Sequence, residues 1–111
     1  ICIATEKNKL KNVKINLDSK KSICIVMASK GYPEKYKSGY TIKGIKKTIN
    51  DTIIYHAGIK LDRKKNIITS GGRVLNIVSS EKNLKKAKSN AYKLVKSIQC
   101  NNLFYRNDIG D

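Results

Sequence analysis

The chain has 111 residues and a mass of 12.5 kDa, which is enough for one compact domain and too little for two. Apolar residues make up 40% of the sequence and charged residues 29%, which predicts an ordinary hydrophobic core and excludes a disordered chain. No apolar run approaches the ~18 residues of a membrane-spanning helix, so we expect no membrane partner and no signal peptide. The formal net charge of +16 by itself suggests nucleic acid or an anionic surface, but because nearly all of the basic residues are Lys we interpret most of it as compositional charge on a soluble surface.

The first third of the chain is expected to form a β-hairpin. Residues 1–12 have the character of a helix tail, and residues 13–17 alternate apolar and polar side chains, as a half-buried strand does. Asp18 to Lys20 supplies a turn, and residues 22–28 form a dense apolar strand in which Cys24 is expected to be a core side chain. A loop from residue 29 to about residue 39 then follows.

The middle of the chain alternates short strands with turns. Isoleucines at positions 42, 45 and 49 recur at helical spacing, but Gly44 interrupts them, so residues 41–50 form a short helical turn at most. Residues 53–61 predict one strand, and residues 62–66 a charged turn. Residues 67–70 and 73–79 predict two strand pieces around a tight corner at Gly71 and Gly72.

The last long element is an amphipathic helix over residues 81–98. Its apolar positions recur at helical spacing and are Leu84, Ala87, Ala91, Leu94, Val95 and Ile98. Ser79 or Ser80 is expected to cap the helix, Glu81 to lie at its positive end, and Asn101 with Asn102 to stop it. The sequence therefore predicts one α+β domain over residues 1–111, a small and mostly antiparallel sheet with one long helix packed on a face and glycine loops along one edge.

Few residues could carry catalysis. His56 is the single histidine, no Gly-x-Ser-x-Gly motif is present, and the eight carboxylates form no spaced pair. Cys2, Cys24 and Cys100 lie far apart, which excludes a CxxC metal site and favours a reducing compartment. We expect no catalytic residue and no metal ligand in this chain.

Two glycine loops are more informative. They are Ser29-Lys30-Gly31-Tyr32-Pro33 and Ser70-Gly71-Gly72-Arg73. Successive glycines let backbone N–H groups approach a phosphate, and a neighbouring arginine can bind it through two hydrogen bonds. Each loop alone is equally compatible with an ordinary turn, but together they indicate an anion-binding edge.

Four motifs in a fixed order carry a resemblance to a known family. They are Ser29-Lys30-Gly31-Tyr32-Pro33, His56-Ala57-Gly58, Thr69-Ser70-Gly71-Gly72-Arg73-Val74-Leu75 and Phe104-Tyr105-Arg106-Asn107-Asp108-Ile109-Gly110. Their order and spacing resemble the C-terminal domain of phosphoribosylamine–glycine ligase, also called glycinamide ribonucleotide synthetase, over the whole chain. This family contains ATP-grasp enzymes of purine biosynthesis.

The resemblance implies an ATP-dependent carbon–nitrogen ligase. Its reaction would join glycine to 5-phosphoribosylamine through glycyl phosphate, with ATP hydrolysed to ADP and phosphate, to give glycinamide ribonucleotide. ATP and Mg²⁺, with Mn²⁺ as an alternative ion, would be bound mainly by N-terminal and ATP-grasp domains that this chain lacks. This domain would complete the acceptor side of a cytoplasmic enzyme, with those domains and the two small-molecule substrates as partners, and would not catalyse alone.

The resemblance also assigns candidate binding residues. Arg73, with Gly71 and Gly72, would hold the phosphate of 5-phosphoribosylamine. Gly31, Tyr32 and Pro33 would border the active site, and His56 would contact substrate. Lys30 replaces a glycine that is usual in the family and would either alter the local backbone shape or add a cation near the anionic substrate. For Arg106 and Asp108, an internal ion pair and a substrate contact both stay open.

Two other interpretations remain. A domain with a structural role in the ligase would touch no substrate. A free-standing Lys-rich module would bind nucleic acid or an anionic surface, although 21 of the 24 basic residues are Lys and the chain has one Phe, six Tyr and no Trp for base stacking.

Overall fold

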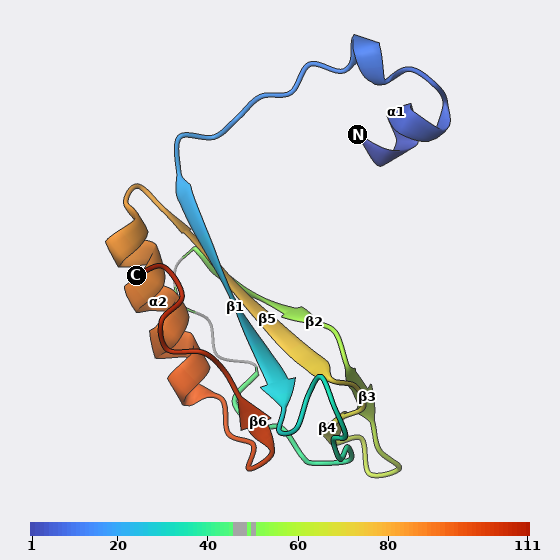
Figure 1. The fold of residues 1–111 in the computed structure, drawn as a ribbon, viewed down its shortest axis with the longest axis vertical. Helices are drawn as coiled ribbons and strands as arrows, with labels where there is room; N and C mark the ends of the chain where they lie inside the picture. The colour runs from blue at the N-terminus through green and yellow to red at the C-terminus, as the bar shows by residue number, and fades with distance from the viewer. Residues whose placement is uncertain (46–48, 50) are drawn as a thin grey trace.

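The computed structural model describes residues 1–45, 49 and 51–111 as an α+β domain preceded by an extended N-terminal segment (Figure 1). Its core element is an antiparallel pair of long strands, β1 (Lys21–Ser29) and β5 (Arg73–Glu81). Strand β2 (Thr52–His56) pairs with the other edge of β5, and β6 (Leu103–Phe104) pairs with β1, which gives the order β2-β5-β1-β6. The predicted fold class is confirmed, since all these pairs are antiparallel.

A second, two-stranded sheet lies at one end of the first. Strands β3 (Ile59–Leu61) and β4 (Ile67–Thr69) pair antiparallel, joined by the charged turn at residues 62–66. The prediction of one strand over residues 53–61 was wrong, because Ala57 and Gly58 separate β2 from β3 and send them into different sheets.

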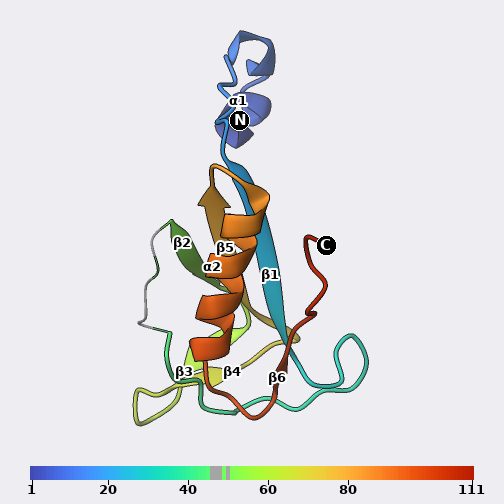
Figure 2. The ribbon, with the colours of Figure 1, turned by 90° about the vertical axis from the view of Figure 1, so that its left-hand side faces the viewer.

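Helix α2 (Leu84–Ser97) covers one face of the large sheet (Figure 2). Its buried side chains Ala87, Ala91, Leu94 and Val95 pack against residues of β1 and β5 such as Ile25 and Ile77, which are opposite each other in register. Alanine at two successive turns lets the helix lie close to the sheet. The long helix packed on one face is therefore confirmed, with Leu84 as an exception because 42% of its surface is exposed.

The ends of α2 differ from the prediction. Asn83, not Ser79 or Ser80, is the N-cap, and its side-chain oxygen accepts a hydrogen bond of 2.8 Å from the backbone N–H of Lys86. Glu81 lies outside the helix as the last residue of β5, buried and bonded to Asn90. The helix ends at Ser97 and has Ile98 as its C-cap, several residues before Asn101.

The predicted N-terminal hairpin does not form. Residues 13–17 belong to no strand, and β6 pairs only with Ala28 and Ser29, at the far end of β1 from the turn at residues 18–20. The apolar side chains of Ile15 and Leu17 are exposed, so nothing in the domain packs against a strand there. Helix α1 (Cys2–Glu6) and a 3₁₀ turn (Leu10–Asn12) precede this extended stretch, and neither contains a buried residue. Figure 1 shows this segment extending away from the domain.

Two further expectations concern the middle of the chain and Cys24. The described part of residues 41–50 contains isolated bridges at Thr41, Lys43 and Ile49 and no helix, while residues 46–48 and 50 of that prediction lie outside the described residues. Cys24 is exposed, not buried, because Ile23, Ile25 and Met27 occupy the helix-facing positions of β1. The described residues contain no helix of the length and apolarity needed to cross a membrane.

The Asn83 cap gives a test of the helix boundary. Replacing Asn83 with Ala removes the acceptor for the N–H of Lys86, and we expect the free energy of unfolding in urea to fall by about 1 kcal/mol. Asn83→Asp is the matched control and should preserve most of the stability, because its carboxylate can accept the same bond. An unchanged unfolding free energy for Asn83→Ala would contradict this assignment of the cap.

Candidate functional site

The candidate site lies on the face of the large sheet that α2 does not cover, at the start of β5. The position of Arg73 in this site results from an irregularity in the pairing of β1 with β5. Met27 is opposite Leu75, but the next β1 residue, Ala28, is opposite Arg73. Val74 is therefore an extra residue, and both Val74 and Leu75 are fully buried. Because side chains alternate along a strand, this β-bulge turns Arg73 away from the core and onto the same face as Ala28.

Glycines allow three segments to meet beside Arg73. A Cβ on Gly58 would lie 2.7 Å from the Cα of Gly71 and 2.6 Å from the carbonyl oxygen of Arg73, so this backbone approach excludes any side chain there. The N–H of Gly58 donates to the Arg73 carbonyl at 2.8 Å, and the N–H of Ser70 donates to the Gly58 carbonyl at 2.8 Å. These hydrogen bonds connect the glycine turn at Gly71 and Gly72 to Gly58, in the segment that separates β2 from β3.

The loop that follows β1 closes the other side of the corner. The Ser29 N–H donates to the Gly72 carbonyl at 2.8 Å, and its hydroxyl donates to the Gly71 carbonyl at 2.9 Å. The ring of Tyr32 lies against Gly72, where a Cβ would be 2.1 Å from Tyr32 Cδ2. Packing of the Tyr32 ring on one side and of Gly58 on the other therefore explains why two glycines occur in succession.

Two hollows open beside Arg73, and Tyr32 lines both. The first, called the Asn76 hollow, has a volume of about 520 Å³ and is lined by Tyr32, Ala57, Gly72, Arg73 and Asn76. The second, called the Cys24 hollow, has a volume of about 320 Å³ and a mostly apolar lining of Cys24, Val26, Ala28, Tyr32, Arg73, Phe104, Tyr105, Arg106 and Ile109. Arg73 thus lies between a polar and an apolar depression.

The arginines of the two hollows differ in their partners. Arg106 forms a two-point ion pair with Asp108, in which its Nε donates to Oδ1 at 2.8 Å and its Nη2 to Oδ2. Within the described residues, no carboxylate lies at ion-pair distance from Arg73. Arg73 is therefore the arginine at this site whose charge is left for an external anion.

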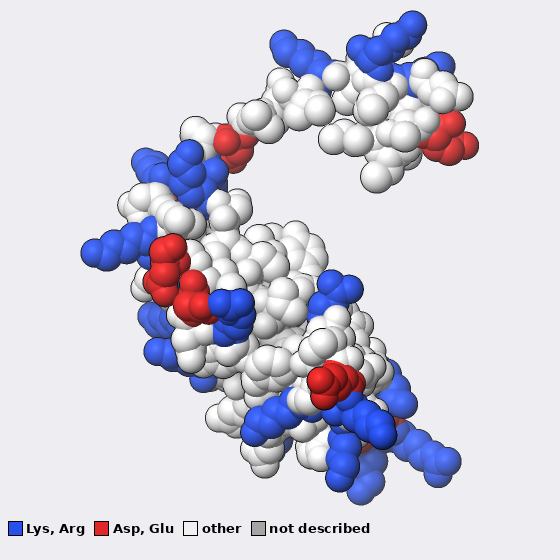
Figure 3. Space-filling view, in the orientation of Figure 1, with Lys and Arg blue, Asp and Glu red and all other residues white. Residues whose placement is uncertain are grey.

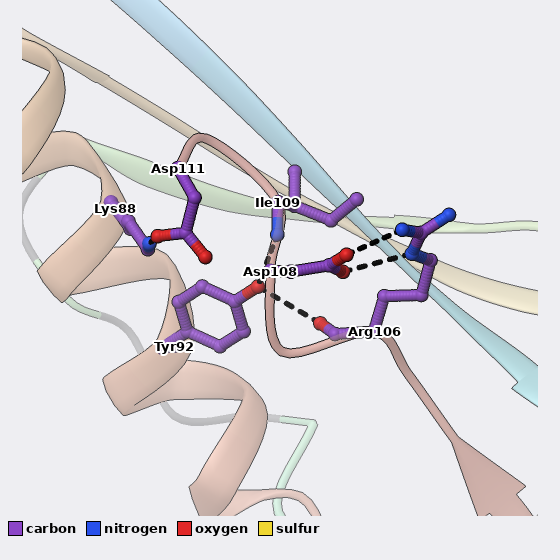
Figure 4. Close-up of polar contacts among 6 residues, drawn as sticks. All are labelled: Lys88, Tyr92, Arg106, Asp108, Ile109 and Asp111. Atoms are coloured by element: carbon purple, nitrogen blue, oxygen red, sulfur yellow. Dashed lines mark hydrogen bonds and ion pairs between the residues drawn. The ribbon is translucent and has the colours of Figure 1, made fainter.

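The C-terminal turn that carries Arg106 is held against α2 (Figure 4). The Tyr92 hydroxyl donates to the Arg106 carbonyl at 2.9 Å and accepts from the Ile109 N–H at 3.1 Å. Lys88 pairs with Asp111 beyond the turn. The hydrogen bonds from Arg106 lower the pKa of Asp108 to about 2, so this internal pair is charged at neutral pH.

The structure brings together some of the predicted site residues and not others. Gly71, Gly72, Tyr32 and Arg73 converge, and Arg106 is close by. His56 is exposed at the end of β2, opposite the buried Leu75, and lines neither hollow.

The remaining predicted residues belong to the loop after β1. Gly31 has φ of 96°, and a Cβ there would lie 2.2 Å from the Lys35 carbonyl oxygen, so glycine is required by the turn. Lys30 and Pro33 are exposed, and the backbone N–H of Lys30 donates to the Asn102 carbonyl.

Sequence reasoning missed Asn76. It lies in an otherwise apolar stretch of β5, and that isolated polar residue is the signal that could have identified it. A larger hollow of about 740 Å³ runs along α2 between lysines such as Lys85 and Lys96, but it contains none of the residues predicted to bind substrate.

Comparison with known proteins gives consistent matches. The family model described as "Phosphoribosylglycinamide synthetase, C domain" matches residues 22–111. The phosphoribosylamine–glycine ligase of Caldanaerobacter subterraneus subsp. tengcongensis is 42% identical over 106 residues, which cover 96% of this chain and 25% of that protein. The enzyme of the same name from Fusobacterium nucleatum subsp. nucleatum is 46% identical over 104 residues, covering 91% of this chain and 24% of that protein.

A solved structure has the same fold. The crystal structure of phosphoribosylamine–glycine ligase from Thermotoga maritima matches with a TM-score of 0.67 at 26% identity, covering 78% of this chain and 21% of that one. The chain therefore has the fold of one domain of a ligase, and it spans about a quarter of the length of the curated relatives it matches. It belongs to the phosphoribosylglycinamide synthetase C-domain family.

These findings decide between two of the interpretations drawn from the sequence. The resemblance carried by the four motifs is confirmed, and the alternative of a free-standing nucleic-acid-binding module is not supported. On the face shown in Figure 3, the Lys and Arg side chains lie mainly on the N-terminal segment and toward the two ends of the domain, and the middle of the domain is largely uncharged.

The contact between Gly72 and Tyr32 is testable by a double-mutant cycle. Gly72→Ala forces the Tyr32 ring out of its position, and we expect a loss of about 1–3 kcal/mol in unfolding free energy. In a Tyr32→Ala background the same change should cost much less, because the clash is gone. Equal losses in both backgrounds, measured by urea denaturation, would contradict the contact.

The Arg106–Asp108 pair gives a pH prediction. Folding lowers the pKa of Asp108 from 3.8 to about 2. The ion pair therefore contributes its full stabilisation of the turn at pH values above 3.8, and this contribution is lost as the pH falls through about 2. A carboxyl-carbon NMR titration should give a midpoint for Asp108 near 2, and Arg106→Met should return it toward 3.8. A wild-type midpoint near 3.8 would show that the pair is not formed.

Proposed function

We propose that the complete enzyme containing this domain joins glycine to 5-phosphoribosylamine and hydrolyses ATP to ADP and phosphate. The product would be glycinamide ribonucleotide, formed through glycyl phosphate. The family match and the names of the relatives support this proposal. The domain completes the acceptor side of the active site and does not catalyse alone.

Arg73 carries the proposed role of the domain. A guanidinium group offers two parallel N–H donors that match a phosphate, and such charge-assisted bonds are about twice as strong as neutral ones. The observation that supports this role is that Arg73 lines both hollows and has no carboxylate at ion-pair distance among the residues that the structure describes, whereas Arg106 is paired with Asp108. The positive field of a chain with net charge +16 would also attract an anionic substrate.

Positioning is the catalytic contribution that this site can make. Holding the phosphate at Arg73 would fix the amine of 5-phosphoribosylamine relative to the acyl phosphate formed by the neighbouring domains. Gly71 and Gly72 contribute by allowing the corner to form, and Gly31, Tyr32 and Pro33 by closing the loop beside it. His56 and Lys30, which line neither hollow, stay proposed contacts of substrate from outside the hollows, and Arg106 with Asp108 forms an internal pair beside the site.

ATP and Mg²⁺, with Mn²⁺ as the alternative ion, are proposed to bind mainly outside this chain. Within residues 1–45, 49 and 51–111, no three His, Cys, Asp or Glu side chains gather closely enough to hold a metal ion, so these residues do not fit such a site. No step assigned to this domain involves the metal.

The proposed partners are the N-terminal and ATP-grasp domains of the same enzyme, in the cytoplasm. The sheet face opposite α2 exposes apolar side chains, among them Val26, Ile53, Tyr55 and Phe104. The N-terminal segment likewise exposes apolar residues such as Ile3 and Leu17. Burial of these surfaces against the other domains would make the domain part of a larger rigid body.

Replacing Arg73 with Ala in the complete enzyme tests this function. Loss of a charge-assisted pair costs about 1.5–3 kcal/mol, so we expect the KM for 5-phosphoribosylamine to rise roughly 10- to 100-fold while the KM for ATP stays nearly constant. Arg63→Ala, in the exposed turn at residues 62–66, is the control for loss of one positive charge. An unchanged KM for 5-phosphoribosylamine would remove Arg73 from the site and favour a structural role for the domain.

A further inference from the structure

The two hollows beside Arg73 differ in what they can bind. Asn76 supplies the Asn76 hollow with a side-chain amide, which can both donate and accept hydrogen bonds. The surface of the Cys24 hollow is mostly apolar, and Arg106, one of its polar side chains besides Arg73 and two tyrosines, is engaged with Asp108. A ligand whose phosphate is held at Arg73 must place the rest of its body on one side or the other.

The hydroxyls of a sugar phosphate favour one of the two hollows over the other. A sugar hydroxyl that leaves water without finding a new partner costs about 1–3 kcal/mol, so hydroxyls avoid an apolar wall. The Asn76 hollow, at about 520 Å³, is also the larger of the two, the other being about 320 Å³.

The position of Asn76 allows its side chain to form hydrogen bonds with those hydroxyls. It is opposite Val26 of β1 and Tyr55 of β2 in register, so its side chain lies on the face of the sheet that α2 does not cover. Strand β5 is paired on both edges, which fixes the Asn76 backbone. Among the described residues, no side-chain hydrogen bond involves its amide, which is half-buried at the hollow.

We propose that the Asn76 hollow takes the sugar of a phosphorylated ligand and that Asn76 hydrogen-bonds its hydroxyls while Arg73 holds the phosphate. Asn76 is then a specificity-determining residue that distinguishes a sugar phosphate from phosphate alone. This inference rests on the proposed function, because it assumes that Arg73 binds the phosphate.

Two probes separate the sugar contact from the phosphate contact in the complete enzyme. Ribose 5-phosphate and inorganic phosphate are each used as competitors against 5-phosphoribosylamine, for wild type, Asn76→Ala, Asn76→Ser, Cys24→Ala and Arg73→Ala. We expect Asn76→Ala to weaken ribose 5-phosphate about 3- to 10-fold, as loss of a neutral hydrogen bond does, and to leave inorganic phosphate unchanged. Asn76→Ser should give an intermediate loss, and Cys24→Ala, on the other side of Arg73, should affect neither probe.

The other outcomes overturn the inference. If Asn76→Ala and Asn76→Ser leave ribose 5-phosphate unchanged, or weaken both probes equally, Asn76 does not contact the sugar. If Cys24→Ala selectively weakens ribose 5-phosphate, the sugar occupies the other hollow. In these cases Arg73→Ala still weakens both probes and the proposed function stands, whereas an Arg73→Ala enzyme that binds both probes normally would overturn the function as well.

Discussion

The position of Arg73 depends on one irregularity in the pairing of β1 with β5. The extra residue Val74 reverses the alternation of β5, which directs Arg73 onto the uncovered face of the sheet. The bulge is held in place by the close approach of Gly58 to Gly71 on one side and by Tyr32 against Gly72 on the other. A side chain at Gly58 would force the backbone of the corner to shift, and one at Gly72 would displace the Tyr32 ring.

The rest of the domain holds this corner rigid. The helix-facing side of β1 and β5 packs against the small side chains of α2, and the C-terminal turn is fastened to the same helix through Tyr92. The sheet thus has one face that packs against α2 and one face on which Arg73 and the two hollows lie. Apolar side chains are exposed on the second face and on the N-terminal segment. This exposure is consistent with one domain of a larger protein, and so is the match of the chain to about a quarter of the length of the ligases.

The fold class and the long helix could be predicted because each depends on a local periodicity, and the glycine corner because its residues are adjacent in sequence. The bulge could not be predicted, since nothing in Val74-Leu75 distinguishes an extra residue from a regular strand. The alternation of residues 13–17 failed as evidence because a strand also needs a surface that buries its apolar side chains, and Ile15 and Leu17 are exposed. Cys24 was misplaced because β1 is apolar on both faces, so its sequence does not reveal which face is buried.

The central claim is that Arg73 binds the phosphate of the acceptor substrate. A crystal structure of the complete enzyme with bound glycinamide ribonucleotide tests it most directly. The account predicts that the phosphate lies within hydrogen-bond distance of the Arg73 guanidinium group, with the sugar toward Asn76. A structure in which Arg73 is instead paired with a carboxylate of another domain, and the phosphate is bound elsewhere, would contradict it.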